Sequence, residues 1–128
     1  MPPQDPGANF FDGFLDDYFA ESEEHLTHAR QTLLILEQAE GRDAAVRPAL
    51  DELFRAFHSL KGISAMVELR PAEKLAHDLE SYLRAVRERH VALTPDGLDA
   101  LFQGTQRLEE VILTRARDLR RNAVAGKG

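Results

Sequence analysis

The sequence predicts an all-α fold, an antiparallel up-down four-helix bundle, and three observations support this prediction. Four segments carry apolar or small residues at helical steps of three and four positions. No segment shows the sustained alternation of apolar and polar residues that marks a half-buried strand. The links between the segments are short, which places successive helices antiparallel. The prediction leaves room for an extra short helix at one end of the bundle.

The 128 residues suffice for one domain with its own hydrophobic core. Residues 1–9 are rich in Pro and Gly and are expected to form a flexible N-terminal lead. The bundle is expected over residues 10–121. Residues 122–128 are expected to form a flexible C-terminal tail.

The first two helices are predicted from their apolar stripes. The first helix is expected to stop near Gly41, and the second to start near Pro48, because proline suits a first helical turn. The first stripe consists of Phe11, Leu15, Tyr18, Ser22, Leu26, Ala29, Leu33 and Leu36. The second stripe consists of Leu50, Leu53, Phe57, Leu60, Ser64 and Val67.

The last two helices have clearer start signals. The third is predicted to start near Pro71, and the fourth at Thr94, an N-cap residue followed by a proline. The third stripe consists of Leu75, Leu79, Tyr82, Leu83 and Val86. The fourth consists of Leu98, Leu101, Thr105, Leu108 and Ile112 and continues to Arg115 and Leu119.

Composition excludes several classes of protein. The chain has no cysteine, which rules out a disulfide framework, thiolate zinc sites and a cysteine nucleophile. No apolar run approaches the ~18 residues of a membrane span, and the first ten residues do not resemble a secretory signal. We therefore expect a cytoplasmic protein that does not interact with membranes.

The charge distribution argues against nucleic-acid binding. The formal net charge is -6, and residues 1–40 hold nine acidic residues against the single base Arg30. An acidic first third repels phosphate. Four arginines near the end of the fourth helix complement the helix dipole and have no aromatic residue among them: Arg115, Arg117, Arg120 and Arg121.

A metal site is not expected either. His25 and His28 lie near Glu21 and Glu24, which could suggest a surface metal. A di-iron site in a bundle needs a glutamate three residues before a histidine on two helices, and no histidine of this chain has one.

The second predicted helix contains an unusual cluster of polar residues. His58, Lys61 and Gly62 share one helix face, at the solvent edge of the core stripe. A glycine inside a helix costs about 1 kcal/mol relative to alanine. A neutral imidazole is a nucleophile toward phosphorus, an ammonium one turn away can neutralise phosphoryl oxygens, and a glycine leaves the surface flat for a partner. The alternative interpretation is an exposed histidine, a solvated lysine and a glycine that lets helices pack closely.

The third predicted helix carries a second polar pair, His77 and Glu80, off its apolar stripe. If this face borders the second helix, Glu80 could accept a hydrogen bond from one ring nitrogen of His58. The other nitrogen would then be the nucleophile. The alternative is a surface pair with little energetic effect.

These residues resemble a known family. The segment His58-Ser59-Leu60-Lys61-Gly62 resembles the H-S-[LI]-K-G signature of histidine-containing phosphotransfer (HPt) domains, and LAHDLESYLRAVRE at 75–88 is similar to a second family segment. The resemblance spans residues 10–120 and is greatest to the HPt domains that begin chemotaxis histidine kinases of the CheA type.

The resemblance implies a role for each matching residue. His58 would be phosphorylated, Lys61 would lie beside the phosphoryl group, Glu80 would hydrogen-bond the imidazole, and His77 would belong to the same polar network. The surface that partners contact would include Arg55, Ser59 and Gly62.

The implied function is that of a phosphorelay carrier. His58 would accept a phosphoryl group from the ATP-binding domain of a histidine kinase and pass it to an aspartate of a CheY-like receiver domain. The carrier would bind no cofactor, since ATP and magnesium belong to its partners. The chain would be part of a CheA-like kinase or a free-standing relay domain, and a monomer when isolated.

Two positions depart from the family pattern. Ile63 and Glu68 stand where the family often has small residues or glycine. Without a glycine at 68, the second helix is expected to run on toward Arg70–Pro71. These departures support an alternative function, a non-catalytic docking module that binds a receiver or kinase without being phosphorylated.

Overall fold

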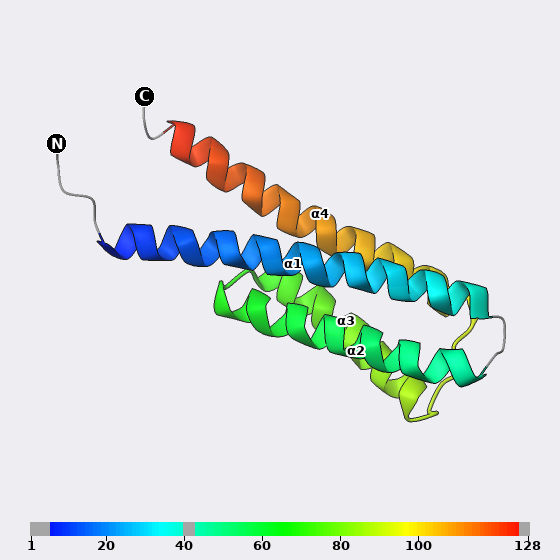
Figure 1. Cartoon of the computed structure of the whole chain (residues 1–128). Helices are drawn as coiled ribbons and strands as arrows, with labels where there is room; N and C mark the ends of the chain where they lie inside the picture. Colours follow the sequence, from blue (N-terminus) through cyan, green and yellow to red (C-terminus); the bar gives the residue numbers. More distant parts are fainter. Residues whose placement is uncertain (1–5, 40–42, 126–128) are drawn as a thin grey trace.

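A computed structural model describes residues 6–39 and 43–125, with side chains for 13–39 and 44–122, and all regular structure in these ranges is helical. The helices are α1 (Pro6–Ala39), α2 (Asp43–Met66), α3 (Arg70–Arg87) and α4 (Pro95–Ala125). α1 packs against α2 and α4, and α3 packs against the same two helices, so the four form a closed ring (Figure 1). The predicted four-helix bundle is confirmed.

The four helices differ in length. α1 has 34 residues and α4 has 31, whereas α3 has 18. At 1.5 Å per residue α1 is about 50 Å long and α3 about 27 Å. The start of α1 and the end of α4 therefore extend past the turn between α2 and α3 (Figure 1). α4 is continuous to Ala125, and the described residues contain no extra short helix.

Besides the end of α2, which is described below, three helix boundaries differ from the sequence prediction. α1 already includes residues 6–9, and α4 includes residues 122–125, which were expected in flexible ends. α2 starts at Asp43, five residues before Pro48. Proline is tolerated there because the carbonyl left without a partner belongs to Ala44, an exposed residue of the first turn that water can reach. Residues 1–5, 40–42 and 126–128, including Gly41, lie outside the described residues.

The predicted stripes supply most of the core, but Arg115, at the end of the fourth stripe, is exposed, and the side chain of Phe11 lies outside the described residues. The largest fully buried apolar side chains come from all four helices: Leu33, Leu53, Phe57, Leu60, Leu83, Leu101 and Leu108. Inside this core the Tyr18 hydroxyl of α1 and the Ser64 hydroxyl of α2 share a hydrogen bond of 2.9 Å. A buried hydroxyl needs such a partner, so this bond favours one register of α1 on α2.

The start of α4 and its packing on α3 follow from local chemistry. The Thr94 hydroxyl accepts a hydrogen bond of 3.0 Å from the Gly97 backbone N–H, as an N-cap does. A Cβ on Gly104 would lie 2.6 Å from a Leu79 methyl carbon. Gly104 therefore lets α3 approach α4 closely.

The end of α2 corrects a prediction. The helix stops at Met66 although no glycine follows, because Glu68 itself adopts the left-handed conformation, with φ 60°. The Leu69 N–H donates to the Ser64 carbonyl at 3.0 Å, and the Glu68 N–H donates to the Ala65 carbonyl at 3.1 Å, which is the Schellman pattern. This backbone costs a non-glycine residue about 1 kcal/mol. The turn lets α3 fold back onto α2.

Candidate functional site

His58 is presented to solvent on α2. Its side chain is 64% exposed. The ring lies nearly parallel to that of Phe54, one turn earlier, with ring centroids 6.2 Å apart and planes 12° apart. This contact fixes one side of the imidazole and leaves its outer edge open. The predicted exposure of His58 is confirmed.

Glu80 lies beneath His58 on α3, with its side chain only 1% exposed. Its carboxylate oxygen Oε2 is 3.1 Å from Nδ1 of His58 and 2.9 Å from Nζ of Lys61. The other oxygen, Oε1, accepts a hydrogen bond of 2.9 Å from Arg84. The predicted contact between Glu80 and the ring is present. The expectation that Glu80 stands off the buried stripe is wrong, because Glu80 belongs to the buried face of α3.

The partners of Glu80 keep it ionised. Burial raises the pKa of this carboxyl, but hydrogen bonds and charge from Lys61 and His58 outweigh burial and lower the pKa below its ordinary value. An ionised carboxylate only accepts hydrogen bonds, so the proton between the two groups resides on Nδ1 of His58. The lone pair of Nε2 is then free on the exposed edge of the ring.

The other residues predicted for the site lie around this centre. Lys61 is half-buried, at 27% exposed, with its ammonium on Glu80. Gly62 is exposed, and a Cβ built on it would meet no atom within 4 Å, so it is not a packing glycine. Arg55 is exposed and Ser59 half-buried on the same helix.

His77 is not joined to the centre as expected. It is exposed on α3, one turn before Glu80. Within the described part of the chain, no hydrogen bond or ion pair links His77 to Glu80, His58 or Lys61. The three-residue spacing placed both side chains toward one side of α3, but only Glu80 turns under α2.

Sequence reasoning missed two residues of the site, Phe54 and Arg84. Phe54 stands four residues before His58, and Arg84 four residues after Glu80, a spacing that brings side chains together on a helix. Arg84 also lies over the Phe54 ring, 5.6 Å from its centroid. A search for acid–base pairs at this spacing would have found Arg84.

The two departures from the family pattern lie away from the imidazole. Ile63 is half-buried and packs against the core. Glu68 is exposed in the turn after α2, whose last residue, Met66, lies eight residues and about 12 Å along the helix axis from His58. Neither side chain forms a hydrogen bond or ion pair with His58, Lys61 or Glu80.

None of the described helices has the length and apolar composition needed to span a membrane.

The chain is similar in sequence to two proteins named for chemotaxis. The chain is 35% identical over 98 residues to "Chemotaxis protein CheA" of Halobacterium salinarum, and 36% identical over 99 residues to "Chemotaxis protein CheA" of Bacillus subtilis. Each match covers 77% of this chain but only 14% of the relative, so this chain corresponds to a small part of those proteins.

A solved structure and a family model cover most of the chain. The structure titled "CheA phosphotransferase domain from Thermotoga maritima" aligns with a TM-score of 0.72 and 29% identity, covering 81% of this chain and 95% of that one. The family model of the Hpt domain matches residues 13–123. Since this match takes in all four helices and the His58 site, the chain belongs to the Hpt domain family.

Proposed function

We propose that this domain is a phosphorelay carrier in which His58 accepts a phosphoryl group at Nε2 and passes it on. One observation carries the proposal: an exposed imidazole whose inner nitrogen is held by a buried, ionised carboxylate, 3.1 Å away. This arrangement selects one tautomer and directs the free lone pair toward a visiting protein. The similarity to the Thermotoga maritima phosphotransferase domain supports it.

The proposed chemistry is a pair of transfers. In the first, Nε2 of His58 attacks the γ-phosphorus of ATP held by a kinase domain. A nitrogen–phosphorus bond forms, and the bond to the ADP oxygen breaks. The ring gains positive charge in this step, and Glu80 stabilises that charge through the Nδ1–H. In the second, a carboxylate oxygen of a receiver aspartate attacks the phosphorus, and the nitrogen–phosphorus bond breaks to restore the neutral ring.

Lys61 has a second role in the proposal. Its ammonium binds the same carboxylate oxygen as His58, so it lies next to the ring. A phosphoryl group on Nε2 adds up to two negative charges at the protein surface. Because Lys61 is partly exposed and flexible, its ammonium can contact both Glu80 and the phosphoryl oxygens. Arg84 keeps Glu80 paired in either state.

The partners we propose are the ATP-binding domain of a histidine kinase and a receiver domain of the CheY type, within a chemotaxis pathway. The relatives named "Chemotaxis protein CheA" support this pathway. The domain itself needs no bound cofactor in this scheme, because its own residues supply the nucleophile and the stabilising charges.

The first prediction tests the phosphorylated residue. When the protein is incubated with a cognate kinase domain and labelled ATP, it should acquire an acid-labile label, because phosphohistidine hydrolyses in acid. The label should disappear in His58→Gln and persist in His28→Gln, a matched change of an exposed histidine on α1. Label that survives in His58→Gln would overturn the proposal.

The second prediction concerns Glu80. Glu80→Gln keeps the size of the side chain but removes the charge that fixes the ring, so phosphorylation should slow by about ten-fold or more, with helical content unchanged. Because the pKa of Glu80 is lowered in the folded state, its stabilising contribution is present above the ordinary pKa of 4.5 and is lost as the pH falls through the folded value.

Two measurements check this second prediction. Rates of phosphorylation should separate the wild type from Glu80→Gln at neutral pH. The difference between their free energies of unfolding should shrink as the pH drops below about 4.5. Equal phosphorylation rates would mean that Glu80 does not position the ring.

The third prediction uses Gly62. Because its Cβ position is open, Gly62→Ala should raise the free energy of unfolding, by up to about 1 kcal/mol. The added methyl lies on the surface that partners approach, so phosphorylation by the kinase should slow several-fold. A variant that is more stable and equally fast would show that Gly62 has no role in docking.

A further inference from the structure

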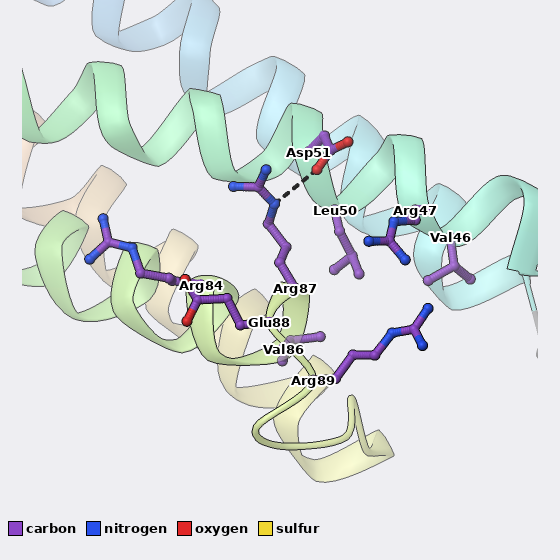
Figure 2. A pocket seen from close by; sticks show the side chains of 9 residues that line it. All are labelled: Val46, Arg47, Leu50, Asp51, Arg84, Val86, Arg87, Glu88 and Arg89. Atoms are coloured by element: carbon purple, nitrogen blue, oxygen red, sulfur yellow. Dashed lines mark ion pairs between the residues drawn. The ribbon is translucent and has the colours of Figure 1, made fainter.

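A second feature lies beside the His58 site, between the start of α2 and the end of α3. It is a pocket of about 660 Å³, shown in Figure 2. Four arginines line it, and we call it the arginine pocket: Arg47, Arg84, Arg87 and Arg89. The rest of the lining consists of three aliphatic side chains and two carboxylates, so arginine is the most abundant residue in the pocket.

Both carboxylates of the pocket already have partners. Asp51 accepts a contact of 2.8 Å from Nε of Arg87, and Glu88 lies 3.6 Å from a ring nitrogen of His90. The side chains of Arg47 and Arg89, in contrast, are exposed and form no hydrogen bond or ion pair with any described residue. In Figure 2 their guanidinium groups come from opposite sides of the pocket and extend into the same space. The pocket therefore holds cationic charge that no other described residue neutralises.

The backbone of Arg89 is strained. It adopts φ 61°, a left-handed backbone, and ends α3 through hydrogen bonds from its own N–H to Val86 and from His90 N–H to Ala85. For a non-glycine residue this conformation costs about 1 kcal/mol, which a glycine would not incur. A strained residue with an unpaired charge is a reason to look for a binding role.

The arginine pocket is continuous with the His58 site. Arg84 binds Glu80, and the guanidinium groups of Arg84 and Arg87 lie 5.6 and 4.5 Å from the centroid of the Phe54 ring that stacks on His58. Asp51 precedes His58 by seven residues, about 10 Å along α2. A typical docked domain buries about 800 Å² per partner, a patch of roughly 16 Å radius. A protein centred on His58 thus reaches the near side of the pocket, and Arg47, eleven residues before His58 and about 16 Å along α2, lies at the edge of its footprint.

We propose that the arginine pocket binds acidic side chains at the rim of the receiver domain that takes the phosphoryl group from His58. This rests on the proposed function. In that step a doubly negative phosphoryl group meets a carboxylate, on a carrier whose formal net charge is -6. Like charges oppose the encounter, and cations beside the site offset the repulsion and speed association. In the kinase step the phosphates of ATP are already paired with magnesium and held by the kinase domain, and His58 itself carries no phosphate, so the pocket has less repulsion to offset.

The experiment compares two double charge reversals. Arg47→Glu with Arg89→Glu changes the pocket. Arg117→Glu with Arg121→Glu makes the same change of charge at exposed positions of α4, at the opposite end of the molecule (Figure 1). His58 is first phosphorylated by a kinase domain or, independently, by phosphoramidate, and transfer is then measured to purified receiver domains from the same genome over a range of salt concentrations.

The pocket variant should lower kcat/KM for transfer by about ten-fold at low salt, and the loss should diminish at high salt. The α4 variant should stay within about two-fold of the wild type, and so should the rate at which the kinase labels each variant. Arg89→Gly provides a second test: it should unfold no more easily than the wild type, yet transfer more slowly, because it keeps the turn and loses the guanidinium.

Each other outcome has a separate meaning. If neither reagent phosphorylates His58, the proposed function fails. If His58 is phosphorylated but the pocket and α4 variants transfer equally, the pocket does not bind the receiver. A slowdown confined to the kinase step, or no transfer to any receiver domain, would likewise overturn the pocket's assignment to a receiver.

Discussion

The burial of one carboxylate organises the site. An ionised glutamate inside a protein is costly unless it is paired and hydrogen-bonded. Glu80, at 1% exposed, meets this requirement with three donors, of which His58 and Lys61 come from α2 and Arg84 from its own helix. The pairing works only when α2 and α3 pack in one register, so the same contacts that hold the helices together also position the imidazole.

Two requirements on His58 conflict with each other, and the surrounding residues satisfy both. The reacting nitrogen must reach water and a partner protein, whereas its orientation must be fixed. His58 is exposed and its position is set from below by a buried group and from one side by the Phe54 ring. The supporting parts are rigid because they belong to helices with a well-packed core, and the surface above them stays open at Gly62. The result is a preorganised nucleophile on an exposed helix face.

Much of this could be predicted from the sequence. The apolar stripes predicted the helices and most of the core, because leucines that recur at helical spacing are usually buried. The spacing of His58, Lys61 and Gly62 gave the face of α2. The sequence could not reveal that Glu80 is buried and His77 is not, because this depends on how α3 is rotated against α2. Small residues on the buried face, Ala72 and Ala76, carried no signal strong enough to show that rotation.

The ends of two helices were also not predictable from the sequence. Glu68 ends α2 in a conformation that sequence rules reserve for glycine, because the packing of α3 on α2 outweighs a local cost of about 1 kcal/mol. Arg89 does the same after α3. Tertiary contacts decide such positions, and both turns lie at opposite ends of the α2–α3 pair that carries the site.

Whether Glu80 selects the tautomer of His58 can be measured from the protonation of the two ring nitrogens, by ¹⁵N NMR of the folded protein at a pH where the imidazole is neutral. We expect a proton on Nδ1 and a bare Nε2, with this preference weakened in Glu80→Gln. A ring that carries its proton on Nε2, or whose tautomer is the same with and without the Glu80 charge, would contradict the role of Glu80 in positioning the nucleophile.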